Sequence, residues 1–285
     1  MGVSAIIVAY NSGAVIGPCL DSLAGVDEII VVDNAADAAL ALRHGIRYIR
    51  NPRNEGYGSG NNIGAAAASH DWLLLVNPDA ALQPDALAAL LRAAQLYPDA
   101  ALLMPQILNP DGSIEPSHDA GLFDKRAMPR RRSDPPPEGD LCADFMSGAV
   151  QLIRRDAFLA VGGFDPAIFM YYDDDDLCLR LRRAGHALVR VQAARAYHIG
   201  GGSSGGSASV LRLKHRNMAW SRLYLEQKYN GRGAAWRHGL ALLLRRLGKG
   251  WLYRLSGNRA KAARDLAYAS GFADFLLGRP APRNL

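Results

Sequence analysis

Four consecutive aspartates, Asp173, Asp174, Asp175 and Asp176, stand between the aromatic run FMYY and the helix-like sequence LCLRLRRAG. Adjacent carboxylates repel one another, so a chain does not need this run in order to fold. The run could be a solvated charged segment, a metal site, or an acid/base site in which only one or two carboxylates act. The ligand spacing and the glycine of an EF-hand calcium loop are absent. An acidic helix start accounts for Asp175 and Asp176, but poorly for Asp173 and Asp174.

Polar residues also end three apolar runs in the first half of the chain. Residues 4–10, 28–34 and 71–80 (SAIIVAY, EIIVVDN and DWLLLVNPDA) are rich in Ile, Val and Leu, as expected for strands buried on both faces. Their polar ends are Tyr10-Asn11, Asp33-Asn34 and Asn77-Pro78-Asp79. Ligands bind at the carboxyl edge of open parallel sheets, so the three ends together favour a binding site. Each alone is weak evidence, because Asn and Asp also cap helices and start turns.

The order of the segments predicts the fold class. Helix-like residues 13–25, 61–69 and 84–98 alternate with the strands, and the connections are short. This alternation is typical of an α/β protein with a mostly parallel central sheet.

Two segments of unusual composition interrupt this order. Residues 109–140 are rich in Pro, Gly and charge and predict a long loop, in which Arg130, Arg131 and Arg132 form a solvated face more readily than a lid. Residues 200–207 (GGGSSGGS) predict a flexible joint before a helical tail.

A glycine-rich loop, NEGYGSGNNIG at residues 54–64, follows the second strand region. Its glycine spacing does not fit GxGxxG, and no such loop follows the first strand, so the sequence does not predict a dinucleotide-binding Rossmann fold. Glycines here would let the backbone approach a ligand closely. Asn62 is expected to cap the helix that follows.

Composition limits the class of protein. The 285 residues are 49% hydrophobic and 21% charged, as in a folded protein with a sizeable core. The N-terminus lacks the pattern of a signal peptide, and no apolar stretch reaches the ~18 residues of a membrane-spanning helix. Cys19, Cys142 and Cys178 lack CxxC spacing, which predicts free thiols in a reducing cytosol rather than disulfides or a structural zinc site.

The tail is strongly basic. Residues 211–285 hold 16 Lys and Arg against three acids, a net charge of +13, so the other 210 residues carry −7 of the overall +6. An amphipathic helix is expected at residues 234–255, whose apolar stripe is Trp236, Leu240, Leu243, Leu247, Trp251 and Leu255. The helix could lie in an anionic membrane interface or pack its stripe on the rest of the protein. A nucleic-acid partner is not favoured, because base-stacking aromatics and known modules are missing.

The motifs together resemble glycosyltransferase family 2. VAYN, VVDN, NEGYGSGNNIG, LLLVNPDA and YHIGG stand in the order of that family, and residues 147–185 resemble its bacterial rhamnosyltransferase-like members. The resemblance implies a GT-A fold in residues 1–205, followed by a basic helical C-terminal region in residues 206–285. It also implies a nucleotide-sugar donor, Mg²⁺ or Mn²⁺, and inversion at the anomeric carbon.

The resemblance further assigns a donor site and a metal site. The residues expected to bind the donor are Val8, Ala9, Tyr10, Asp33, Asn54, Gly56, Asn62 and Asp79. Asp33 would accept a hydrogen bond from the N3–H group of a pyrimidine. The sequence Asn77-Pro78-Asp79 stands where the family has its Asp-x-Asp motif, so Asp79 would bind the metal together with His198. Two protein ligands suffice when diphosphate oxygens and waters complete the coordination of such an ion.

The same resemblance divides the four aspartates. Asp174 would be the catalytic base, which removes a proton from the sugar hydroxyl that attacks the donor. Asp173 stands where the family has Glu, and would form an acceptor site with Ser147 and Gly148. Asp175 occupies a variable position, and Asp176 is expected to cap the following helix.

The sequence therefore predicts a metal-dependent inverting glycosyltransferase of cell-surface polysaccharide synthesis, with dTDP-L-rhamnose as the expected donor. The acceptor would be a glycan or a polyprenyl-diphosphate-linked sugar, and the location the cytoplasm, where the tail could contact the inner face of the membrane. A non-catalytic nucleotide-sugar-binding protein is one alternative. A nucleotidyltransferase is another, although the expected Gly-rich basic loop is absent from AYNSGAVIG, which has no Lys or Arg.

Overall fold

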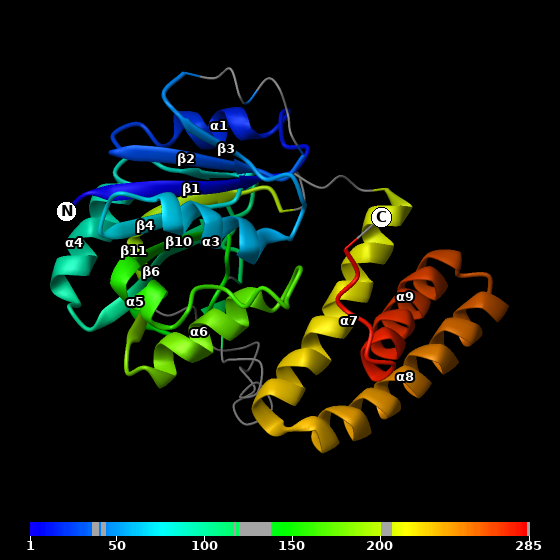
Figure 1. Ribbon diagram of the computed structural model, residues 1–285. Helices are drawn as coiled ribbons and strands as arrows, with labels where there is room; N and C mark the ends of the chain where they lie inside the picture. Colours follow the sequence, from blue (N-terminus) through cyan, green and yellow to red (C-terminus); the bar gives the residue numbers. More distant parts are fainter. Residues whose placement is uncertain (36–39, 41–43, 117, 120–137, 201–206, 284–285) are drawn as a thin grey trace. The chain divides into compact units, whose positions relative to one another are not determined.

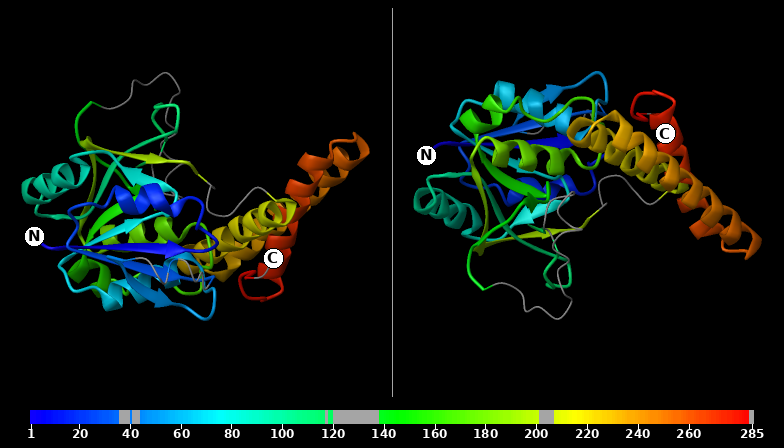
Figure 2. Two further views of the ribbon diagram at one scale, coloured as in Figure 1. Left: turned by 90° about the horizontal axis from the view of Figure 1, so that it is seen from above. Right: turned by 90° about the horizontal axis from the view of Figure 1, so that it is seen from below.

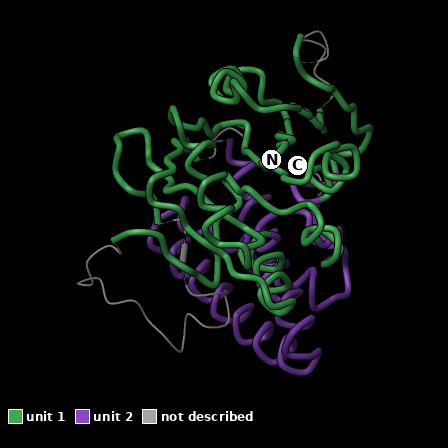
Figure 3. The backbone as a smooth tube through the Cα atoms, turned by 90° about the vertical axis from the view of Figure 1, so that its left-hand side faces the viewer, with its two compact units in different colours: residues 1–54, 59–164, 174–204 green, residues 55–58, 165–173, 205–285 purple. Residues whose placement is uncertain are grey.

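The computed structural model describes residues 1–35, 40, 44–116, 118–119, 138–200 and 207–283 (Figure 1). Arg130, Arg131 and Arg132 and most of the predicted glycine joint lie outside the described residues. The chain divides into two compact units (Figure 3). The first comprises residues 1–54, 59–164 and 174–204, and the second residues 55–58, 165–173 and 205–285. The boundary predicted at residue 205 stays a prediction, but two short upstream segments join the second unit.

The first unit is built on a mixed sheet of nine strands among the described residues. Eight of the strands follow the order β3-β2-β1-β4-β10-β6-β11-β5, and β8 pairs with β11. Strands β3, β2, β1, β4, β6 and β11 run in the same direction, so the prediction of an α/β sheet with mostly parallel strands is confirmed. The bounds are β1 (Val3–Ala9), β2 (Glu28–Asp33), β3 (Arg47–Arg50), β4 (Trp72–Val76), β5 (Ala80–Leu82), β6 (Ala100–Leu108), β8 (Leu141–Cys142), β10 (Val150–Arg154) and β11 (Ala187–His198).

Helices lie on both faces of this sheet (Figure 1). Every residue of β1 and β4 is buried in consequence, which is why these strands are continuously apolar in sequence. The described helices of this part of the chain are α1 (Ile16–Asp21), α3 (Tyr57–Ala67), α4 (Ala86–Leu96), α5 (Arg155–Ala160) and α6 (Asp173–Arg183). A small two-stranded sheet pairs β7 (His118–Asp119) with β9 (Phe145–Met146).

The apolar run at residues 71–80 does not form the single strand that the sequence predicts. Strand β4 ends at Val76, and the backbone N–H of Ala80 closes a turn onto the carbonyl of Asn77. Pro78 has no N–H to donate to a ladder, so a turn is favoured at this point. The chain then enters β5, which pairs antiparallel with β11 instead of continuing beside β1.

Two glycines of the Gly-rich loop bring α3 against β1. A Cβ atom on Gly60 would lie 2.6 Å from Cγ1 of Val8, and one on Gly64 would lie 2.4 Å from Cγ2 of Ile6. These glycines therefore allow a helix–strand approach that any larger residue would prevent.

The second unit is mainly helical. Its helices α7 (Ala208–Asn230), α8 (Arg232–Leu255) and α9 (Arg259–Leu276) lie side by side (Figure 2). Their core contains Trp220, Leu223, Phe272 and Phe275, and the upstream residue Phe169 belongs to the same cluster. The helical C-terminal region predicted from the sequence is confirmed.

Helix α7 also holds the segment 165–173. The hydroxyl of Ser221 donates to the carbonyl of Met170 (3.1 Å). The carboxylate of Asp165 accepts hydrogen bonds from the Tyr224 hydroxyl (2.9 Å) and from Nζ of Lys228 (2.7 Å). This segment leads directly into the four aspartates, so the C-terminal helices support the chain at the entrance to α6.

The same segment contains strained and closely packed backbone. Tyr171 and Tyr172 both have φ of 65°, a left-handed conformation that is unusual for bulky residues. Gly56 has φ of 94°, and a Cβ atom there would lie 1.9 Å from the carbonyl oxygen of Phe169. Only glycine fits this position, because both the conformation and the space exclude a side chain.

Replacing Gly271 by Ala should destabilise the second unit. The added Cβ would lie 2.1 Å from the carbonyl oxygen of Arg216 and 2.8 Å from Cβ of Ala219, so α7 and α9 must separate. We expect the free energy of unfolding to fall by about 1–3 kcal/mol in urea denaturation. Gly248→Ala is the matched control, because nothing lies within 4 Å of its Cβ, and it should be neutral or stabilising. Equal effects of the two substitutions would contradict this packing.

The contribution of Asp165 to stability should depend on pH. Burial raises the pKa of Asp165, but the hydrogen bonds from Lys228, the Ala167 N–H and Tyr224 outweigh burial and hold this pKa below its usual value. A depressed pKa in the folded state adds stability above the unfolded value of ~3.9, and this stability is lost as the pH falls through the folded value.

Asp165→Asn should therefore lower the free energy of unfolding by about 1–3 kcal/mol at neutral pH. The difference from the wild type should shrink as the pH falls below ~4 in a series of denaturation curves. Asp156→Asn is the control, because the pair of Asp156 with Arg154 is exposed and should contribute little. A difference that stays constant over this pH range would show that the Asp165 charge is not the cause.

Candidate active site

The four aspartates all lie in the first turn of α6, which begins at Asp173. Free backbone N–H groups and the helix dipole favour carboxylates there. The prediction that Asp176 caps the helix is wrong, because Asp176 lies inside it and is fully buried. Its carboxylate instead accepts a hydrogen bond from Nε of Arg180 (2.8 Å), one turn further along the helix. Asp173 is buried as well, and its role toward an acceptor stays a prediction.

Asp174 is fixed beside Ser147 and Gly148. Its Oδ2 atom accepts a hydrogen bond from the backbone N–H of Gly148 (3.1 Å), and its Oδ1 atom accepts one from the N–H of Asp175 (3.0 Å). The side chain is only half-buried, so solvent or a substrate can reach it. The structure thus brings the expected base next to the residues expected to contact the acceptor.

The expected metal motif, Asn77-Pro78-Asp79, is hydrogen-bonded to the chain next to Gly148. The backbone N–H of Asn77 donates to the carbonyl of Ala149 (2.9 Å), and Ala149 directly follows Gly148. Val76, the last residue of β4, pairs with Val150, the first residue of β10. Asn77 and Asp174 are therefore joined through Ala149 and Gly148 at one edge of the sheet.

Asp79 and His198 also lie together. Oδ1 of Asp79 is 3.6 Å from Nε2 of His198, and the Asp79 side chain is 2% exposed. Nδ1 of His198 lies 3.2 Å from Oε2 of Glu115. Burial lowers the pKa of His198, but its hydrogen bonds and charge interactions with Asp79 and Glu115 outweigh burial and raise this pKa above its usual value.

These residues fit a divalent ion that is shared with a substrate. The described part of the chain contains no group of three or more His, Cys, Asp and Glu side chains placed to hold a metal by itself. Asp79 and His198 supply two donors, and Mg²⁺ and Mn²⁺ are commonly held by one or two protein ligands together with phosphate oxygens and waters. A carboxylate such as Glu115 on the second ring nitrogen is a usual partner of a metal-binding histidine.

Glu115 was not among the residues that the sequence singled out. It lies in the Pro- and Gly-rich segment, where spacing carries no signal for a carboxylate that faces His198. The segment reaches this position because the N–H of Glu115 donates to the carbonyl of Ile107, beside the end of β6.

The predicted donor residues of the first two strands lie at the same edge of the sheet. Val8 and Ala9 are buried at the end of β1, and Tyr10 is 36% exposed. Asp33 is fully buried, and its carboxylate accepts hydrogen bonds from the Ala35 N–H (2.8 Å) and the Tyr48 hydroxyl (2.9 Å). Binding of a nucleobase by these residues stays a prediction.

Three asparagines connect the ends of β2 and β3 to the Gly-rich loop. Nδ2 of Asn51 donates to Oδ1 of Asn34 (2.7 Å), and Nδ2 of Asn34 donates to Oδ1 of Asn54 (3.3 Å). Asn54 was predicted as a donor-site residue. The sequence did not predict that Asn34 and Asn51 form a network with it. An isolated Asn after a strand reads equally as a turn residue, so sequence alone gives no signal for the network.

Asn62 lies within α3, because the helix begins at Tyr57, and the prediction that Asn62 caps this helix is wrong. Its side-chain amide instead donates to the carbonyl of Phe164 and accepts from the N–H of Phe164, both at 2.8 Å. Gly56 belongs to the second unit, where it packs on Phe169. Donor binding by either residue stays a prediction.

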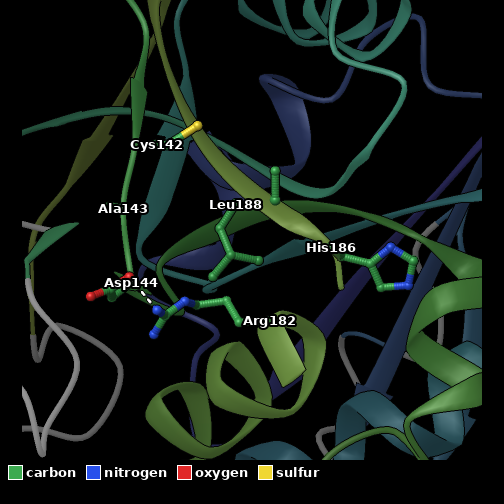
Figure 4. Close-up of a pocket in the computed structure, with 7 residues that line it drawn as sticks. Cys142, Ala143, Asp144, Arg182, His186 and Leu188 are labelled. Carbon is green, nitrogen blue, oxygen red and sulfur yellow. Dashed lines mark ion pairs between the residues drawn. The ribbon is translucent and has the colours of Figure 1, made fainter. Parts of the chain in front are cut away.

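A separate cavity of about 150 Å³ lies beside β8 and the start of β11 (Figure 4). An ion pair between Asp144 and Arg182 (2.7 Å) crosses its wall, and Cys142 and His186 also line it. None of the residues predicted for catalysis, donor or metal binding lines this cavity.

Comparisons with known proteins agree with this geometry. The family model of glycosyl transferase family 2 matches residues 4–162. An N-acetylglucosaminyl-diphospho-decaprenol L-rhamnosyltransferase of Mycobacterium tuberculosis is 31% identical over 279 residues, which cover 84% of this chain and 88% of the relative. The rhamnosyltransferase WbbL of Escherichia coli K12 is 30% identical over 223 residues, which cover 68% of this chain and 81% of the relative.

A solved structure of GalNAc-T7 with UDP, GalNAc and Mn²⁺ superposes with a TM-score of 0.56 at 18% identity, covering 77% of this chain and 48% of that one. At this identity the likeness concerns the fold, and it confirms the predicted GT-A architecture. Because the family model spans more than half of the sequence and the mycobacterial relative most of it, the chain belongs to glycosyltransferase family 2.

Proposed function

We propose that the protein is a metal-dependent inverting glycosyltransferase that transfers L-rhamnose from dTDP-L-rhamnose to a polyprenyl-diphosphate-linked sugar during cell-surface polysaccharide synthesis. The names of the mycobacterial and Escherichia coli relatives support rhamnose as the sugar, and the mycobacterial name supports a lipid-linked acceptor. The observation that carries the proposal is the position of Asp174. Its carboxylate is held at the same sheet edge as Asp79 and His198, through Gly148, Ala149 and Asn77.

Asp174 acts as the general base in this proposal. A sugar hydroxyl is a weak nucleophile near pH 7, and a carboxylate within hydrogen-bond reach removes its proton as the new bond forms. The N–H groups of Gly148 and Asp175 each bond one oxygen of the Asp174 carboxylate and fix its orientation. One base acting opposite the leaving group produces a single displacement and therefore inversion, without the paired carboxylates that a retaining enzyme uses.

Asp79 and His198 hold the divalent ion in this proposal. When bound, Mg²⁺ or Mn²⁺ would offset the negative charge that develops on the departing nucleoside diphosphate. Glu115, on the Nδ1 side of His198, fixes the orientation of the imidazole ring so that Nε2 faces Asp79. The solved GalNAc-T7 structure, which contains UDP and Mn²⁺ in the same fold, supports this assignment.

Replacing Asp174 by Asn should abolish transfer while leaving donor binding unchanged. Loss of a general base typically lowers turnover by about 10²–10⁴-fold. Release of dTDP from dTDP-L-rhamnose in the presence of a lipid-linked acceptor measures transfer, and calorimetry measures donor binding. Asp175→Asn is the matched control, because it changes a neighbouring carboxylate in the same helical turn and should leave turnover nearly unchanged.

Two results would contradict this reading. Full transfer activity of the Asp174→Asn variant would show that another group is the base. Donor binding by the wild type without turnover on any lipid-linked sugar would instead favour a nucleotide-sugar-binding protein.

Asp79→Asn and His198→Gln should each weaken Mn²⁺ binding in the presence of dTDP by at least about ten-fold, since each removes one of two protein donors. The electron paramagnetic resonance signal of free Mn²⁺ gives the dissociation constant without any turnover. Glu115→Gln should have a smaller effect, because Glu115 acts only through His198. Glu138→Gln, at an exposed carboxylate, is the control. Unchanged Mn²⁺ binding in both Asp79→Asn and His198→Gln would exclude this site.

A further inference from the structure

Helix α8 presents a row of exposed apolar side chains. Their exposed fractions range from 36% to 82%, and the residues are Trp236, Leu240, Leu244, Leu247, Trp251 and Leu255. Spacings of three and four residues place them along one side of an α-helix. We call this row the α8 stripe. Two exposed tryptophans within a contiguous apolar row are unusual on a protein surface that contacts only water.

The α8 stripe is separate from the side of α8 that packs in the second unit. Ala235, Gly239 and Gly250 are buried. A Cβ atom on Gly239 would lie 2.8 Å from Cδ1 of Leu223, and one on Gly250 would lie 2.8 Å from Cδ2 of Leu266. These glycines bring α8 close to α7 and α9, so the helix is already anchored. Leu243, which the sequence placed in the stripe, is partly buried against this core instead.

The charge around the α8 stripe is positive. The sequence of α8 contains no Asp or Glu, and Arg237, Arg245, Lys249 and Arg254 are exposed. The guanidinium of Arg254 lies 5.7 Å from the ring of Trp251. Long basic side chains next to apolar ones can keep their charge in a polar layer while their methylene groups cover apolar surface.

The acids of the C-terminal helices do not offset this charge, because basic side chains hold them inside the unit. Among residues 207–283 the acids are Glu226, Asp265 and Asp274. Asp265 is fully buried and pairs with Arg246 and Arg264, and Asp274 is 3% exposed and pairs with Arg216 and Arg279. Glu226 is 16% exposed and contacts His238. The surface of these helices therefore carries mainly positive charge.

We propose that the α8 stripe lies in the headgroup layer of an anionic membrane, with its apolar side chains inserted and its basic residues on the lipid phosphates. An amphipathic helix with aromatic residues on one side and Arg and Lys on the other binds such an interface through apolar burial and charge. In the part of the chain that the structure describes, no helix has the length and apolar character to cross a bilayer. The helix lies along the surface.

A second copy of the chain is a less suitable occupant. Two α8 stripes packed together would bring Arg237 and Arg254, which flank the stripe, of both copies close to one another, and α8 has no acid to pair with them. Like charges across an interface oppose association, whereas anionic headgroups complement them.

The inference is argued from the surface of α8 and does not depend on the transfer chemistry. It adds an anionic membrane as a partner of the proposed enzyme. The unit that carries the α8 stripe also contains segment 165–173, which α7 holds through Ser221, Tyr224 and Lys228. That segment leads into Asp174. Binding of the second unit to lipid would therefore bring the protein to the membrane in which a polyprenyl-linked acceptor resides.

Tryptophan fluorescence tests the insertion directly. Of the four tryptophans, Trp72 and Trp220 are 7% and 6% exposed, whereas Trp236 and Trp251 are 45% and 59% exposed. Full-length protein is mixed with vesicles of phosphatidylethanolamine and about 30% phosphatidylglycerol, some with brominated acyl chains that quench inserted indoles. We expect quenching of the wild type, and loss of this quenching in Trp236→Ser/Trp251→Ser. Vesicle-bound wild type without any quenching would overturn the proposal.

Sedimentation with the same vesicles measures affinity. Trp236→Ser/Trp251→Ser should bind about ten-fold or more weakly, and Arg237→Gln/Arg254→Gln should also weaken binding and reduce its dependence on salt. Leu96→Ser/Leu159→Ser is the matched control, because these leucines of the first unit are 67% and 48% exposed and should not matter. Equal binding of the tryptophan variant and this control would overturn the proposal. So would a wild-type dimer, measured by light scattering without lipid, that the tryptophan variant disrupts.

Transfer to a water-soluble acceptor analogue separates this inference from the proposed function. The tryptophan variant should keep wild-type transfer in solution while losing vesicle binding. A wild type that binds anionic vesicles through the α8 stripe but transfers no sugar would refute the proposed function and leave the membrane surface standing.

Discussion

The site depends on the point at which β4 stops. The strand is fully buried up to Val76, and the turn at Asn77 then directs the chain into β5, which pairs with β11. This turn places the Asp79 carboxylate beside His198 at the end of β11. It also leaves the Asn77 N–H to bond Ala149, next to the Gly148 N–H that holds Asp174. A strand that continued straight to residue 80 would carry the Asp79 carboxylate away from His198.

The four aspartates show how one helix start can give identical side chains different environments. All of them gain from the dipole of α6, but Asp176 is completely buried and paired with Arg180, whereas Asp174 is half-buried on the Gly148 N–H. Burial with a fixed cation suits a structural ion pair. A partly open carboxylate that accepts backbone hydrogen bonds suits proton transfer, because a substrate hydroxyl can still approach it.

The C-terminal helices have two physical roles, which share one unit. Their buried ion pairs and close glycine contacts hold α7, α8 and α9 together, and Ser221 of α7 also holds segment 165–173. Strained conformations at Tyr171 and Tyr172 need such support, since left-handed backbone at bulky residues persists only when surrounding contacts fix it. The helices are therefore structural partners of the chain that enters α6, in addition to any lipid contact.

The sequence by itself determined the α/β class, the buried strands and the motifs that place the chain in its family. Continuous apolar runs and short motifs can be recognised from neighbouring residues alone. It also singled out Asp79, His198 and Asp174 as candidates, whose roles stay predictions. It missed Glu115 and the part of Asn34 and Asn51 in the asparagine network, and it assigned helix caps to Asn62 and Asp176 wrongly. The cap at Asp176 was wrong for a local reason, because the helix begins three residues earlier and Asp176 pairs with Arg180 one turn further along. Only the tertiary structure decided the other cases, because each depends on a contact between residues far apart in the chain, such as Glu115 with His198 and Asn62 with Phe164. The break after Val76 likewise depends on the pairing of β5 with β11.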